Sequence, residues 1–144
     1  MRLPELTPAE VAAERDQFRR PCGTIADVEW GRLDCLVAFR RAHEAMRLAA
    51  DENHASPQVR GTRIRQAFQA SGCDEARERL ILTATEDVAT AIDASYHSLR
   101  EVREVLASGR GITSADYHAA REAHGDATRA ARTVLRRDLS SQEA

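Results

Sequence analysis

The segment DYHAAREAHG, residues 116–125, holds two histidines, two carboxylates and a tyrosine, which are the side chains of metal sites and acid–base pairs. Each residue of a helix advances by about 100°, so His118 and His124 on one helix point about 240° apart. They cannot bind the same metal ion from one helix. His118 instead lies over Glu122 at i,i+4, a spacing typical of a solvated surface pair. We therefore expect His118 and Glu122 to face water.

Two histidines interrupt apolar stripes. His124 falls in a stripe with Tyr117, Ala120, Ala127, Ala131 and Val134, and His43 falls in one with Leu36, Phe39, Met46 and Ala50. A buried polar side chain without a hydrogen bond destabilises a fold by roughly 1–3 kcal/mol. Folding the last helix back on the preceding one brings position 124 level with about residue 98, beside Ser95 or Leu99. We expect a core polar pair, Ser95 with His124. The alternative is that His43 and His124 converge as metal ligands or as an acid–base pair.

Known catalytic and metal-binding patterns are missing from the sequence. Di-iron carboxylate bundles use two Glu-x-x-His motifs, and this chain has none. Asp51 and His54 have half of that spacing, but they lie where a helix is expected to end. The sequence also lacks a Gly-rich phosphate loop, G-x-S-x-G and H-E-x-x-H. We predict no catalytic residue, no cofactor and no metal; His43 and His124 are the remaining metal candidates.

Nucleic-acid binding is not expected either. The net charge of −2 gives no general attraction to phosphate. Residues 60–80 have the outline of a helix-turn-helix, but Phe68 and Glu78 occupy positions where a small and an apolar residue are needed. The arginines near the end of the last helix complement the helix dipole and need no ligand: Arg129, Arg132, Arg136 and Arg137. An acidic partner or a nucleic acid for this cluster stays open as an alternative.

Composition predicts one soluble domain over residues 1–144. Hydrophobic residues make up 42% and charged residues 31%, a balance typical of globular proteins. Every basic residue is arginine, as is common in high-GC bacteria. Cys22, Cys35 and Cys73 form no metal or disulfide pattern, which favours a reducing, cytoplasmic location. No apolar run approaches the ~18 residues of a membrane span, and the first residues lack the apolar core of a signal peptide.

Hydrophobic periodicity near 3.6 runs through the chain, so we predict an all-α antiparallel helical bundle. Three long helices are expected at about 25–51, 74–108 and 115–138, and two short ones at about 8–20 and 57–70. Thr7 and Pro8 supply the N-cap and first residue of helix 8–20. The helix at 74–108 has an apolar seam with coiled-coil spacing. The seam consists of Ile81, Thr85, Val88, Ile92, Ser95, Leu99, Val102 and Leu106.

Charges beside these seams suggest which helices pair. Acidic residues flank the seam of helix 74–108, whereas Arg40 and Arg47 flank the stripe of helix 25–51. Complementary flanking charges select helix pairs, so these two helices are predicted to be neighbours. Alternatively, helix 74–108 pairs with its own copy in a second subunit. Either way, a protein partner or a homo-oligomer is expected.

Three short motifs carry a family resemblance: Trp30-Gly-Arg-Leu, Val37-Ala-Phe-Arg-Arg-Ala and Arg136-Arg137-Asp138-Leu139. In this order they resemble a loose group of uncharacterised helical-bundle proteins of high-GC bacteria. The resemblance implies a soluble bundle and brings no established function or site. We therefore expect a non-catalytic cytosolic protein-interaction or scaffold module that self-associates. The alternative is a bundle that binds a small ligand or metal through His43 and His124.

Overall fold

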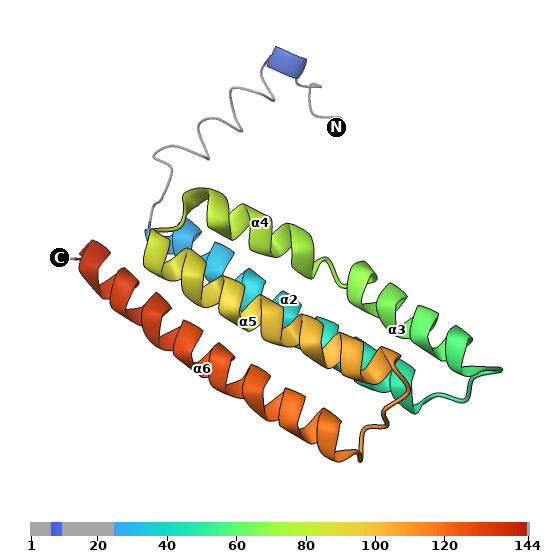
Figure 1. Ribbon diagram of the computed structural model, residues 1–144. Coiled ribbons are helices and arrows are strands. Elements are labelled where there is room, and N and C mark those ends of the chain that lie inside the picture. The colour runs from blue at the N-terminus through green and yellow to red at the C-terminus, as the bar shows by residue number, and fades with distance from the viewer. Residues whose placement is uncertain (1–6, 10–24, 144) are drawn as a thin grey trace.

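The computed structural model describes residues 7–9 and 25–143, and all regular secondary structure in these residues is helical. The helices form a bundle (Figure 1). They are α2 (Ile25–Asp51), α3 (Pro57–Ala70), α4 (Cys73–Thr83), α5 (Glu86–Ala107) and α6 (Ala115–Glu143). No helix in the described part of the chain is both long enough and apolar enough to cross a membrane.

The helices expected at 25–51 and 57–70 have the observed bounds of α2 and α3. The side chain of Ser56 caps α3 by accepting a hydrogen bond from the backbone N–H of Val59 at 3.1 Å, and Pro57 follows as its first residue. The last helix, expected to end near residue 138, continues to Glu143. The predicted helix 8–20 lies outside the described residues, apart from Pro8 and Ala9, which are helical.

The prediction of one continuous helix over 74–108 is wrong, because the chain breaks between α4 and α5. Ala84 and Thr85 both have extended backbones, with ψ of 150° and 162°. The Thr85 hydroxyl accepts a hydrogen bond from the Val88 N–H, and Glu86 and Asp87 occupy the first turn of α5. Thr85 is therefore an N-cap and not a seam residue, and the acidic first turn is stabilised by the helix dipole.

Apolar side chains from every described helix between α2 and α6 build one core. Contacts along α5 and α6 run in opposite order, because Ser95 contacts Thr128 while Ser98 contacts His124. Figure 1 shows α4 and α6 on opposite sides of α5. The helices expected at 25–51 and 74–108 are predicted to be neighbours. This contact is present, because α2 packs on both α4 and α5. The largest fully buried apolar side chains are Phe39, Met46, Ile64, Ile92, Leu99 and Leu106.

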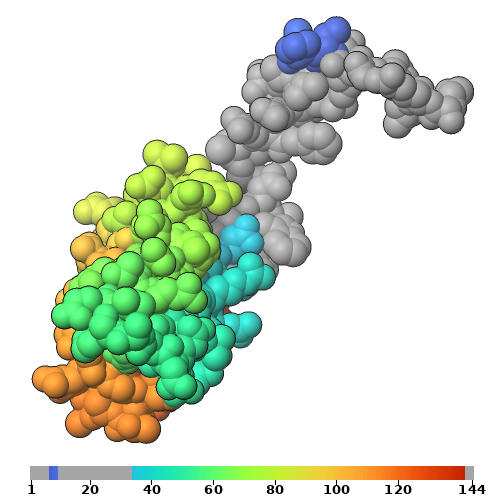
Figure 2. All heavy atoms as spheres, turned by 90° about the vertical axis from the view of Figure 1, so that its right-hand side faces the viewer, coloured from blue at the N-terminus to red at the C-terminus, as the bar shows by residue number. Residues whose placement is uncertain are grey.

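Arg60, in the first turn of α3, links this helix to the C-terminal ends of α2 and α5. Its guanidinium donates to the carbonyl of Ala50 in α2, at 3.2 Å, and to that of Leu106 in α5. A third bond reaches the carbonyl of Arg110, at 2.8 Å. Carbonyls at a helix C-terminus have no partner within the helix, so Arg60 acts as a shared C-cap. Figure 2 looks onto this end, where the start of α3 lies beside the α5–α6 connection.

Gly61 allows α3 to approach α5 closely. A Cβ built at this buried position would lie 3.1 Å from the carbonyl oxygen of Ala107, which is tighter than ordinary packing. Three arginines of the 60–80 segment, which has the outline of a helix-turn-helix, make contacts within the fold. Arg60 caps two helices, Arg63 pairs with Glu52, and Arg65 pairs with Glu104.

Candidate functional site

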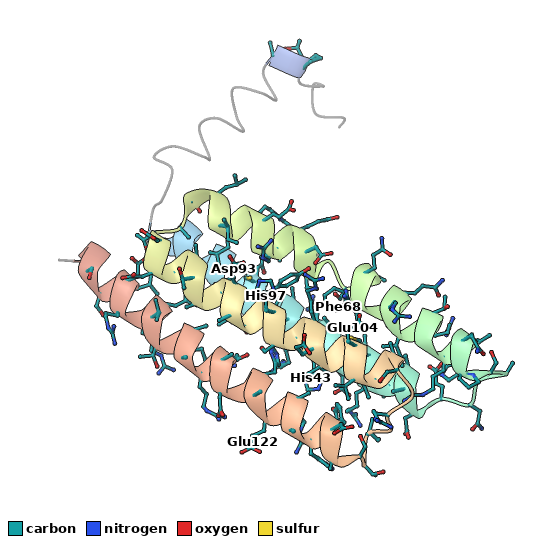
Figure 3. All side chains as sticks on the ribbon, in the orientation of Figure 1. His43, Phe68, Asp93, His97, Glu104 and Glu122 are labelled. Atoms are coloured by element: carbon teal, nitrogen blue, oxygen red, sulfur yellow. The ribbon has the colours of Figure 1, made fainter. Side chains whose placement is uncertain are left out.

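A polar cluster lies inside the bundle where α2, α5 and α6 meet. It contains His43 from α2, Ser95 and Ser98 from α5, and Tyr117, His124 and Thr128 from α6. Figure 3 shows His43 in the space between α5 and α6. Ser95 and His124 are the buried polar residues of the described core, at 0% and 7% exposure. Since the remainder of this core is apolar, the cluster is the candidate functional site.

His124 reaches Ser95, but through a different atom from the one expected. Its Nδ1 lies 3.2 Å from the backbone carbonyl of Ser95 and 2.8 Å from the hydroxyl of Ser98. Ser98 uses its own proton to donate to the Ser95 carbonyl at 2.6 Å. The Ser98 oxygen must therefore accept from His124, which places the imidazole proton on Nδ1. The Ser95 hydroxyl pairs instead with Thr128, at 3.0 Å.

The structure also brings His43 and His124 together. Their ring centroids are 5.8 Å apart, with the rings edge to face. His43 Nε2 forms a 3.0 Å hydrogen bond with the hydroxyl of Tyr117, which is itself buried. Each histidine thus commits one ring nitrogen to a neighbour within the bundle.

Burial governs the acid–base behaviour of the cluster. Burial, assisted by the nearby His43 and opposed by the hydrogen bond to the Ser95 carbonyl, lowers the pKa of His124 to about 4. Burial is also the main cause that lowers the pKa of His43, assisted by Arg121 and Arg47 and opposed by Glu44. The pKa of Tyr117 is raised, again because burial disfavours the charged form. Both histidines are therefore neutral near pH 7, and Tyr117 keeps its proton.

His43 and His124 are the side chains of the cluster that could act as metal ligands. Among the described residues, no three His, Cys, Asp or Glu side chains are grouped as metal ligands would be. Asp51 and His54, which have half of a Glu-x-x-His spacing, do not join the cluster. His54 Nε2 instead lies 2.6 Å from the carbonyl of Ala49, near the end of α2.

Other residues singled out from the sequence lie away from the cluster. His118 and Glu122 are exposed, as expected, and Figure 3 shows Glu122 on the outer side of α6. Cys35 and Cys73 are free and buried. Burial raises the pKa of the Cys35 thiol to about 12, which suits a core residue and not a nucleophile. Cys22 lies outside the described residues.

Sequence reasoning missed Ser98, Thr128 and the pairing of His43 with Tyr117. The antiparallel register predicted from the sequence already places position 124 beside about residue 98. Ser98 lies beside the apolar seam of α5 and not within it, so the stripe did not select it. The contact between His43 and Tyr117 joins residues 74 positions apart, and no local pattern signals it.

No protein-family model, curated protein or solved structure matches this chain.

Proposed function

We propose that this chain is a non-catalytic cytosolic interaction or scaffold module that associates with a second copy of itself. The interior supports this proposal, because the polar side chains of the cluster bond to each other or to the backbone within the bundle. The proposal treats the bundle as antiparallel, in agreement with the opposite order of contacts along α5 and α6. The contact with the second copy is then expected on the outer surface of the helices.

The observation that carries the proposal is the exposure of Leu82 on α4. Its side chain is 83% exposed, more than any other large hydrophobic residue in the described part of the chain. Burying apolar surface contributes roughly 25 cal/mol per Å², so covering one leucine contributes about 1.5–3 kcal/mol. Leu82 stands at the end of α4, next to the break before α5, where a second molecule can reach it.

Size-exclusion chromatography with light scattering tests self-association. The wild-type chain is expected to form a dimer whose proportion rises with protein concentration. Leu82→Asp should shift it to the monomer, and Leu48→Asp is the matched control, because Leu48 is also exposed but lies on α2. A wild-type chain that stays monomeric over the whole soluble concentration range refutes the proposed function.

A second candidate, a metal- or ligand-binding bundle, draws support from the 5.8 Å separation of the His43 and His124 rings. One nitrogen of each ring, Nδ1 of His43 and Nε2 of His124, has no hydrogen-bond partner among the described residues. Elemental analysis of the purified chain tests this candidate. Stoichiometric metal that is lost in His43→Ala and in His124→Ala would favour it over the interaction module.

A further inference from the structure

The C-terminal half of α6 exposes a run of arginines. Arg129 pairs with Asp126 on the same helix, whereas Arg132, Arg136 and Arg137 have no ion pair with any described residue. Residues 129, 132 and 136 share one helix face, since steps of three and four residues bring side chains into line. We call Arg129, Arg132, Arg136 and Arg137 the basic stripe.

Unpaired carboxylates lie on α4. Glu75 and Glu78 are exposed and have no ion pair with a described residue, and the exposed Arg79 follows Glu78 at the next position. We call Glu75 and Glu78 the acidic ridge. Leu82 follows Glu75 and Glu78 on the same face of α4, at steps of three and four residues. The ridge therefore has an apolar side chain beside its carboxylates.

The stripe and the ridge do not neutralise each other within one molecule. Figure 1 shows α4 and α6 on opposite sides of α5, and the two helices make no contact. The end of α6 and the break between α4 and α5 nevertheless lie at the same end of the bundle. One molecule thus presents both an unpaired basic surface and an unpaired acidic surface at that end.

We infer that the basic stripe of one copy docks on the acidic ridge of a second copy. This inference rests on the proposed self-association and names its surface. In a two-fold symmetric pair each stripe meets the partner's ridge, so the contact is made twice. Opposite charges on the two surfaces fix their relative orientation and speed association. Leu82 is buried against Ala130 and Thr133, which are exposed between the arginines of the partner copy.

Charge-swapped variants test the surface. The first carries Arg132→Glu and Arg136→Glu, and the second carries Glu75→Arg and Glu78→Arg. In a dimer of either variant alone, side chains of like charge face each other across the contact. The dissociation constant of that dimer should therefore rise by at least about tenfold at low salt. Mixing the two restores opposite charges at both contacts, so a one-to-one heterodimer should form at near wild-type strength.

Circular dichroism checks that every variant keeps its helix content; the substituted side chains are all exposed. Arg41→Glu with Arg63→Glu is the matched control for the stripe variant, because it changes the net charge by the same amount and sign but lies on α2 and α3. A wild-type dimer that persists in both swapped variants, or a mixture that fails to pair, overturns this inference while the proposed function stands. A monomeric wild-type chain overturns both.

Discussion

Acid should destabilise this protein through His124 as the pH falls below 6.5. The pKa of His124 is about 4 in the folded chain, compared with 6.5 as its ordinary value. Below pH 6.5 the unfolded chain binds a proton that the folded chain resists, so the stabilisation is complete above pH 6.5 and is lost as the pH falls toward 4. Each pH unit in this window is worth about 1.4 kcal/mol.

Between pH 7.5 and pH 5 the linkage predicts a loss of about 2 kcal/mol in the free energy of unfolding. The lowered pKa of His43 adds to the loss with the same sign. Urea denaturation at the two pH values measures it. In the control, His124→Asn, an amide N–H replaces the Nδ1 donor toward Ser98 and the Ser95 carbonyl but does not titrate.

The wild-type chain should lose more stability than His124→Asn between these pH values, by about the stated amount. Equal pH dependence in both chains would refute the reasoning. So would an NMR titration in which the ring of His124 protonates near pH 6.5, because the imidazole would then be as well solvated as in the unfolded chain.

Two further substitutions test the packing of the bundle by urea denaturation. Tyr117→Phe leaves His43 Nε2 without its 3.0 Å partner, so unfolding should become easier by about 1–2 kcal/mol. Arg60→Met keeps the alkyl stem but removes two hydrogen bonds to helix-end carbonyls and one to the Arg110 carbonyl in the α5–α6 connection, so about 2–4 kcal/mol should be lost. Arg63→Met is its control and should change stability by less than about 0.5 kcal/mol, because its ion pair with Glu52 is 3.6 Å long and exposed.

The helical class and most helix bounds follow from local features of the sequence. Ser56 and Pro57 start α3 because a side-chain cap and a fixed φ act within one turn. The break at Thr85 was equally local, since a threonine before Glu86 and Asp87 is an N-terminal signal. It was overlooked because the apolar seam runs through it in register. Hydrophobic spacing and capping gave opposite indications there, and in the structure the cap prevails.

By itself the sequence determined that His43 and His124 belong to apolar stripes and that His118 faces water, because a residue's angle around its own helix decides this. Only the tertiary structure decided which atoms meet: His124 with Ser98 and the Ser95 carbonyl, and His43 with Tyr117. Partners across helices depend on the rotation and height of each helix in the bundle. A shift of a few ångströms exchanges one hydroxyl for the next, because hydrogen bonds form only over a narrow range of distances.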